Sequence, residues 1–332
     1  MRHLKTLGLV IVLLIALASS NIAWYFYLNQ LPEEGQPKVV VRLCKQYGFH
    51  YGQHIIMEHF ELIENHSGGK ATTEWYTMSG GVTINEAIVA GSLDFASMGI
   101  APAITAVHQG IGTKILLSMG SKEHMLWTWR EDIQSIADIK AGDKINLVQV
   151  GSIEYVGLVK AFVDLGRTAE DVDDVAVYYK HPDGYQLMEQ REIDAHFSGA
   201  PYNAMYDADP SYHKISEDTE IWGVPLPGSA LIATTKFKEE HPEIFSAVIT
   251  AWMDATHWII NNEQEAAQII GEYFEYEDIW QNWQDSALLW NPTFGLSAVK
   301  DLADIMYDIG QLDRQMTLEE LLFEETLGLI GE

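Results

Sequence analysis

Residues 79–102, SGGVTINEAIVAGSLDFASMGIAP, constrain the fold more than any other part of the chain. Gly80 and Gly81 precede apolar residues at helical spacing, which predicts a short helix with bare backbone N–H groups at its start. Gly91 stands where helices often end, and a short buried strand is predicted to follow and to stop at Gly99. Such a unit brings a helix N-terminus and a strand end to one edge of a sheet, where α/β proteins hold small polar molecules.

This stretch resembles the substrate-binding proteins of ABC importers in the nitrate/sulfonate/taurine family. A later stretch, residues 237–259, resembles the same family. The resemblance extends over about residues 39–261 and implies an α/β, two-lobed periplasmic-binding-protein-like (type II) fold with a ligand cleft between the lobes. The positions in and just before the first stretch that match the family pattern are Glu74, Trp75, Ser79, Gly80, Glu86, Ala87, Ile88, Gly91, Leu93, Asp94, Phe95, Gly99 and Pro102.

A chain of 332 residues is long enough for two lobes, each with its own core. We expect lobe 1 to comprise residues 38–126 and 229–332, and lobe 2 to comprise residues 127–228. Residues 31–37 are polar and contain two prolines, which is typical of a linker. We also expect helices over residues 51–65 and 236–261 and a strand over residues 145–150.

We expect residues 1–30 to form a signal peptide or an N-terminal membrane anchor. Basic residues precede an apolar run, and Ala16-Leu17-Ala18 has the small-x-small form of a cleavage site. However, the apolar character continues through an aromatic cluster to Leu28, which gives about the ~20 residues that a membrane-spanning helix needs. Both alternatives place the rest of the chain outside the cytoplasm, in the periplasm or on the outer face of the cytoplasmic membrane.

The chain is strongly acidic, with 48 acidic against 20 basic residues and a formal net charge of −28. Nucleic acids and anionic lipid surfaces are therefore poor partners. The acidity fits either a solvated surface, for example in a salty habitat, or a preference for cationic or neutral ligands. The single cysteine, Cys44, excludes an intramolecular disulfide and a Cys-rich metal site, and we expect it to be a core residue.

Two predicted helix starts form the candidate binding site. Ser79, Gly80 and Gly81 offer N–H groups from lobe 1, and Ser152 and Ile153 offer them from lobe 2. Together they would hold a sulfonate, carboxylate or phosphate without an arginine. Ser152 is equally well explained as an N-cap residue alone.

Arginine recognition is not the expected mode, although we expect Arg42 and Arg130 to lie near the cleft. Glu154 has two interpretations: it points to solvent and complements the helix dipole, or it faces the cleft and pairs with an ammonium or N–H group of the ligand. His196 and Gly199 stand where the family often has tryptophan, which argues against a standard sulfonate or nitrate ligand. The remaining candidate ligand-binding residues are Gln46, Phe49, His50, Ile100, Tyr155, Ser198, Tyr202 and Trp222.

The sequence shows no nucleophile–base pair, so we expect no catalytic residues and no cofactor. His50, His54 and His59 lie near one predicted helix, and His50 and His54 are one turn apart. No third ligand in a characteristic motif accompanies that pair, so we expect no metal site. The resemblance implies a protein, expected to be a monomer, that captures a small polar molecule and delivers it to an ABC importer permease. The alternatives are a pyrimidine-precursor (thiamin-related) binding protein or enzyme of the same fold, and a membrane-tethered ligand sensor.

Overall fold

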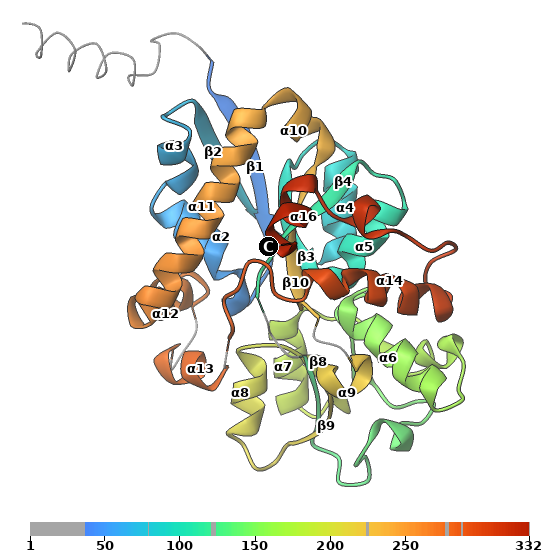
Figure 1. Ribbon diagram of the computed structural model, residues 1–332. Helices are drawn as coiled ribbons and strands as arrows, with labels where there is room; N and C mark the ends of the chain where they lie inside the picture. The colour runs from blue at the N-terminus through green and yellow to red at the C-terminus, as the bar shows by residue number, and fades with distance from the viewer. Residues whose placement is uncertain are drawn as a thin grey trace, which may run out of the picture.

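The computed structural model describes residues 37–78, 80–120, 124–223, 226–275, 279–286 and 288–331. Within them, two five-stranded sheets with their helices lie one above the other (Figure 1). The first sheet has the order β2-β1-β3-β10-β4, in which β10 runs antiparallel to both of its neighbours. Its strands are β1 (Val39–Lys45), β2 (Ala71–Thr77), β3 (Phe95–Gly99), β4 (Thr113–Ser118) and β10 (Ser229–Thr234).

Successive residues of the first sheet point to opposite faces, and both faces are buried. On β1, Val41 and Leu43 join one hydrophobic core and Cys44 joins the other. On β10, Leu231 belongs to the Val41 core and Ile232 to the Cys44 core. Burial raises the pKa of the Cys44 thiol to about 12, so this cysteine is an unreactive core residue, as expected from the sequence.

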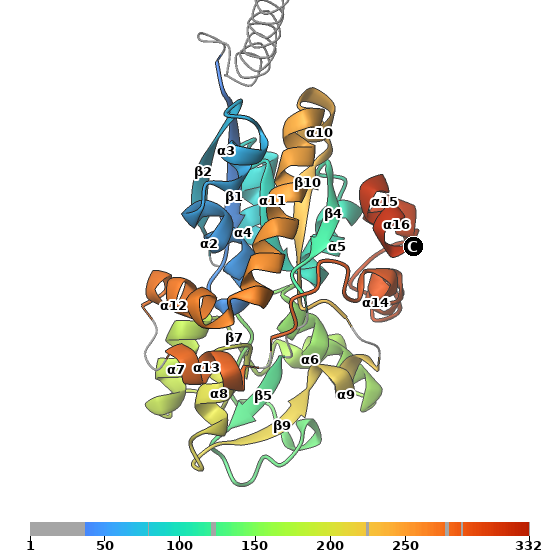
Figure 2. The ribbon, with the colours of Figure 1, turned by 60° about the vertical axis from the view of Figure 1, so that its left-hand side comes forward.

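Helices cover both faces of this sheet, as Figure 2 shows from the side. Helices on the Val41 face are α2 (Gly52–His59), α3 (Leu62–His66), α10 (Thr235–Glu240), α11 (Pro242–Asn261), α12 (Glu263–Tyr273) and α13 (Ile279–Asp285). Helices on the Cys44 face are α4 (Gly81–Val89), α5 (Ile100–His108), α14 (Val299–Asp308), α15 (Leu318–Leu321) and α16 (Glu324–Ile330). Short 3₁₀ turns precede two of these helices, η1 (Phe49–Tyr51) before α2 and η4 (Leu296–Ala298) before α14.

The second sheet has the order β7-β6-β8-β5-β9, with β5 antiparallel to both β8 and β9. Its strands are β5 (Met125–Thr128), β6 (Ile145–Asn146), β7 (Ala176–Val177), β8 (Ala195–Ser198) and β9 (His213–Glu217). Its helices are α6 (Ile153–Asp164), α7 (His181–Glu189), α8 (Tyr202–Asp207) and α9 (Asp218–Trp222), with 3₁₀ turns η2 (Ile136–Asp138) and η3 (Ala169–Val172). The chain passes to this sheet between β4 and β5 and returns between α9 and β10. We therefore propose the same two lobes as expected from the sequence, with the first crossing placed before Met125.

The fold prediction is confirmed for the stretch after residue 79. Helix α4 begins at Gly81 and ends at Val89, and β3 follows and stops at Gly99. Gly91 adopts a positive φ of 72°, a conformation that suits glycine at a helix end.

Three predicted elements are shorter than expected. The helix expected over residues 51–65 breaks between α2 and α3, where Glu61 has a φ of 50°. The helix expected over residues 236–261 divides at His241, because Pro242 has no N–H group and begins a new helix. The strand expected over residues 145–150 stops at Asn146, since Val148 has a φ of 57° that no strand accepts.

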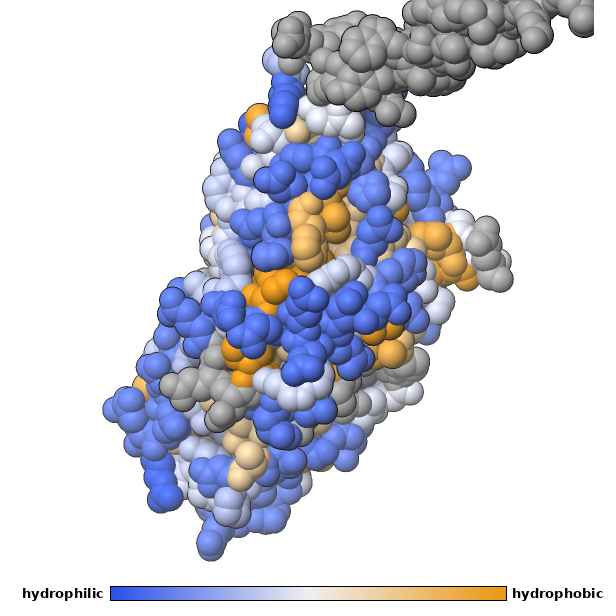
Figure 3. Space-filling view, turned by 90° about the vertical axis from the view of Figure 1, so that its left-hand side faces the viewer, coloured by the Kyte–Doolittle hydropathy of each residue, from blue (hydrophilic) through white to orange (hydrophobic). Residues whose placement is uncertain are grey.

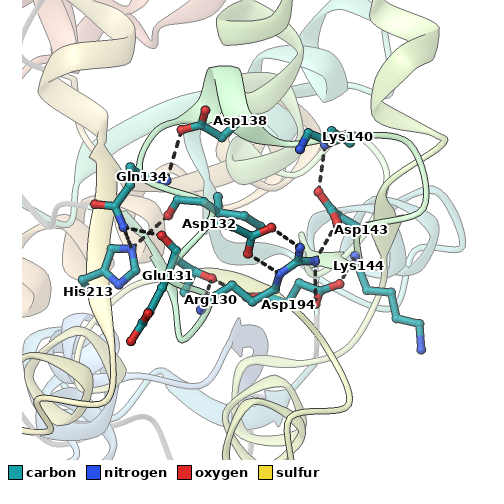
Figure 4. A network of polar contacts seen from close by, with 12 residues as sticks. Arg130, Glu131, Asp132, Gln134, Asp138, Lys140, Asp143, Lys144, Asp194 and His213 are labelled. Atoms are coloured by element: carbon teal, nitrogen blue, oxygen red, sulfur yellow. Dashed lines mark hydrogen bonds and ion pairs between the residues drawn. The ribbon is translucent and has the colours of Figure 1, made fainter.

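Neither of the two arginines expected near the cleft lies there. Arg130 pairs with Asp132, Asp143 and Asp194, as Figure 4 shows. Asp194 directly precedes β8, so this network lies at the end of the strand away from the cleft. Arg42 likewise pairs with Asp94, which directly precedes β3. Both arginines therefore form ion pairs at the ends of the sheets that lie away from the cleft.

Hydrophilic side chains cover most of the face seen in Figure 3, and patches of apolar side chains interrupt them. This surface agrees with the formal charge of −28. Within the part of the chain that the structure describes, no helix is long and apolar enough to cross a membrane. The predicted signal or anchor segment, residues 1–30, and nearly all of the predicted linker fall outside the described residues.

Candidate ligand-binding site

A cavity of about 50 Å³ lies between the two lobes. This is several times the roughly 10–15 Å³ that one water molecule needs, so the cavity can hold a small ligand. The carboxyl ends of the parallel strands β1, β3, β6 and β7 all supply lining residues or lead into them, as expected for an open α/β sheet. The lining residues are Gln46, Tyr47, His50, Tyr51, Gly80, Gly81, Gly99, Pro102 and Ser229 from lobe 1, and His124, Val148, Gln149, Ser152, Ile153, Glu154, Lys180 and His181 from lobe 2.

Glu154 carries the negative charge of the cavity. It sits in the first turn of α6, but its side chain is only 5% exposed. One of its carboxylate oxygens, Oε1, lies 3.3 Å from Nε2 of His124 and 3.5 Å from Nε2 of His181. On its other side, His124 Nδ1 lies 2.7 Å from a carboxylate oxygen of Asp218. Glu154 therefore does not point to solvent, and the interpretation in which it faces the cleft fits the structure.

A chain of polar groups leads from Glu154 into lobe 2. His181 Nδ1 lies 3.0 Å from His196 Nε2, and His196 Nδ1 lies 2.9 Å from the hydroxyl of Tyr206. Burial holds the pKa of His196 well below its usual value, and burial also raises the pKa of Tyr206. Both groups are therefore neutral at pH 7. When the hydrogen bonds of this chain are oriented so that Glu154 accepts one, Tyr206 donates to His196, His196 donates to His181, and His181 donates to Glu154.

The start of α4 is occupied by a side chain of the other lobe. With its amide oxygen turned toward α4, the orientation that pairs donors with acceptors, Gln149 accepts from Val82 N at 2.8 Å and from Gly81 N at 3.0 Å. The backbone N–H of Gly81, which the sequence suggested for an anion, thus donates to a neutral carbonyl, as does that of Val82.

Ser152 is the N-cap residue of α6. Its hydroxyl accepts from the backbone N–H of Tyr155 at 3.2 Å and donates to the carbonyl oxygen of Leu147 at 2.7 Å. Its proton is therefore directed at the backbone. The N-cap interpretation therefore accounts for both hydrogen bonds of the Ser152 hydroxyl without a ligand.

Lobe 1 contributes a polar and aromatic wall. The side-chain amide of Gln46 donates to the carbonyl oxygen of Ser97 at 3.3 Å. The ammonium of Lys180, from lobe 2, lies 5.9 Å from the ring centre of Tyr47, within the range of a cation–π contact between the lobes. Burial raises the pKa of Tyr51, which keeps its hydroxyl protonated. The ring of His50 lies 4.0 Å from that of Tyr51, measured between centroids, and the two ring planes are tilted by 50°.

The structure places seven of the candidate residues on the cavity: Gln46, His50, Gly80, Gly81, Ser152, Ile153 and Glu154. Six others lie away from it, each with a contact that explains its position. Phe49 packs on Trp283, Ile100 is in the core, Tyr155 reaches Asp173, Ser198 donates to Asn203, Tyr202 packs near Tyr185 and His181, and Trp222 donates to Asp218. Ser79 falls outside the described residues.

Sequence reasoning missed His124, Gln149, Lys180 and His181. Gln149 follows β6, and Lys180 and His181 follow β7, so the rule that ligands bind at the carboxyl ends of strands would have singled them out. His124 precedes the antiparallel strand β5, whose amino end lies at the same edge. Only the strand directions of the second sheet reveal that position.

The histidines do not assemble into a metal centre in the described residues, where no group of three or more His, Cys, Asp or Glu side chains is arranged to hold a metal. His50 lines the cavity, whereas His54 is buried, 5.1 Å from the ring of Trp252 between centroids. Burial lowers the pKa of His54 as well, so it is a neutral core residue.

Two lobes with a cavity at their facing strand ends define the periplasmic-binding-protein fold, and solved structures of that fold match this chain along most of its length. The alkanesulfonate-binding protein SsuA from Xanthomonas axonopodis pv. citri, bound to MOPS, is similar with a TM-score of 0.72 and 15% identity, covering 87% of this chain and 99% of that chain. The periplasmic nitrate-binding protein NrtA from Synechocystis PCC 6803 has a TM-score of 0.70 and 13% identity, with 90% and 89% covered. The periplasmic aliphatic sulphonate binding protein SsuA from Escherichia coli has a TM-score of 0.66 and 17% identity, with 87% and 93% covered.

Residues 155–271 also match the sequence profile of the NMT1-like family. No protein with a curated description matches the chain in sequence. The family match and the structural neighbours confirm the resemblance and the two-lobed α/β fold predicted from the sequence.

Proposed function

We propose that this protein captures a small polar solute outside the cytoplasm and delivers it to the permease of an ABC importer, without converting it. The observation that carries the proposal is the polar cavity between the lobes, built from the facing strand ends of two sheets. Rotation of one lobe about the two crossing segments would open and close such a cavity. The likeness to sulfonate- and nitrate-binding proteins supports the transport role.

The chemistry of the cavity favours a neutral or cationic solute that donates hydrogen bonds. Among the described residues, the cavity lining contains no arginine, and its one carboxylate, Glu154, is only 5% exposed. Its one lysine, Lys180, has its ammonium 5.9 Å from the ring centre of Tyr47. A buried carboxylate is stabilised by N–H donors, and a ligand ammonium or amide would add to those of the histidines. We therefore place sulfonate and nitrate behind amines and N–H-rich heterocycles as ligands.

The proposal includes the location and the assembly. Residues 1–30 would export the protein and either be removed or stay as a tether, and the protein would act as a monomer with the permease as its partner. The described part of the chain begins at the end of lobe 1 that faces away from lobe 2 (Figure 2). A tether attached there would leave the cavity between the lobes accessible.

Native mass spectrometry of the full-length chain, purified in mild detergent without added ligand, tests this function. We expect one small molecule bound per chain, which is released unchanged when the protein is denatured. Prolonged incubation of the protein with the released compound should yield no product. Sustained conversion of that compound would show an enzyme of the same fold instead.

A further inference from the structure

A tight turn between β6 and α6 carries one side chain across the cleft. The turn is held at both ends, because Gln149 N donates to Leu147 O at 2.5 Å and Ser152 N donates to Gln149 O at 3.2 Å. Within it, Val148 has a φ of 57°. A β-branched residue rarely adopts this conformation, which is strained and persists where the surrounding structure enforces it. The strained turn projects the side chain of Gln149 toward lobe 1.

The receiving surface in lobe 1 has room for this side chain only because it is made of glycine. A Cβ atom added to Gly80 would lie 2.2 Å from the other terminal atom of the Gln149 amide, which is the nitrogen once the oxygen faces α4, and this is closer than any real contact. Gly81 is restricted from the opposite side, since a Cβ atom there would lie 2.4 Å from Cβ of Pro102. The two glycines thus let the start of α4 accept the amide of Gln149 at hydrogen-bond distance.

We propose that Gln149 determines specificity by excluding anions from the start of α4 in the closed cleft. The inference rests on the proposed function in that both concern the same cavity. An oxyanion that entered this place would have to displace a carbonyl that accepts from both Gly81 N and Val82 N. It would also bring an uncompensated negative charge into a cavity in which the carboxylate of Glu154 and the ammonium of Lys180 already offset each other.

The neutral amide of Gln149, unlike an anion, favours closure of the cleft. It satisfies two of the N–H groups that any helix start leaves without a partner, and it brings no charge into the closing cleft. Loss of the amide should therefore convert the start of α4 into a site for small oxyanions, which helix N-termini bind readily.

Calorimetric titration of the full-length chain with sodium nitrate, sodium sulfate and sodium methanesulfonate tests the proposal. The variants are Gln149→Ala and Gln149→Ser, which remove the amide, and Gln149→Glu, which replaces it with a carboxylate. The matched control is Gln190→Ala, because Gln190 is an exposed glutamine at the end of α7 in the same lobe. Circular dichroism melts establish that each variant is folded.

We expect Gln149→Ala and Gln149→Ser to bind at least one of the three anions ten or more times as tightly as the wild-type chain and the control. Gln149→Glu should bind none of them. Affinities in the alanine and serine variants within twofold of wild type for all three anions would overturn the proposal. Tight anion binding by the wild type that weakens in these variants would overturn it too. Failure to find a co-purified solute would count against the proposed function and leave this result intact.

Discussion

At the scale of single residues, burial decides the protonation state of the histidines around the cavity. His196 is fully buried between His181 and the hydroxyl of Tyr206, and burial holds its pKa well below the usual value. The sequence placed His196 at a family tryptophan position, but it did not reveal these neighbours. They come from α7 and α8, and only the fold brings them together.

The depressed pKa of His196 predicts that the protein loses stability in mild acid. An unfolded histidine binds a proton near pH 6.5, whereas folded His196 does not, so the unfolded state gains more protons below that pH. The free energy of unfolding should fall as the pH falls below 6.5, by up to about 1.4 kcal/mol per pH unit for this group. In urea unfolding between pH 7.5 and 5, His196→Gln should show a shallower decline than wild type.

The exposed His257 provides the control for this measurement. His257→Gln should keep the slope of the wild-type protein, which also includes the contribution of buried His54. An equal slope in His196→Gln and wild type would contradict the assignment of a neutral, buried His196.

At the scale of elements, local sequence signals predicted what is local and missed what depends on neighbours. The glycines that bound α4 and the helical spacing between them are local, and that helix was predicted correctly. The break before α11 was missed, although Pro242 marks it, because the polar run of residues 238–243 (KEEHPE) has no apolar spacing that would show where one helix ends and the next begins. The short strand β6 was overestimated, since apolar residues continue after Asn146 into a turn.

The link between β1 and α2 gives a prediction about stability. The ammonium of Lys45, whose side chain is fully buried, lies 2.8 Å from a carboxylate oxygen of Glu58, and the rings of Trp75 and Tyr273 lie within 5.2 Å and 4.6 Å of it. Glu58→Ala should lower the free energy of unfolding by about 2–3 kcal/mol, because it leaves a buried charge without its counterion. The partial exposure of Glu58 keeps the effect below that of a fully buried pair.

The double variant Lys45→Met, Glu58→Ala separates charge from packing. Methionine fills much of the volume of lysine without its charge, so the double variant should unfold at a urea concentration close to that of wild type. Equal destabilisation in the single and double variants would show that Glu58 acts through packing alone.

At the scale of the whole molecule, the sequence indicated two lobes and one cleft, and half of the candidate residues lie on the cavity between them. The sequence did not predict the contacts between the two lobes. Gln149 reaching Gly81, and Lys180 reaching Tyr47, join residues far apart in the chain whose proximity no local pattern encodes. The same holds for Glu154, whose position in the first turn of α6 suggests exposure until lobe 1 and the histidines are placed around it.

The central claim is that the solute is held between the lobes, against Glu154. Titration of the wild-type chain and Glu154→Gln with the solute found by native mass spectrometry, at low salt and at 0.5 M salt, tests it most directly. Glu170→Gln is the control, because Glu170 is an exposed glutamate of the same lobe. We predict that Glu154→Gln weakens binding by about 2 kcal/mol or more at both salt concentrations, because a buried charge pair is poorly screened, while the control binds like wild type. Unchanged or tighter binding by Glu154→Gln would contradict the account.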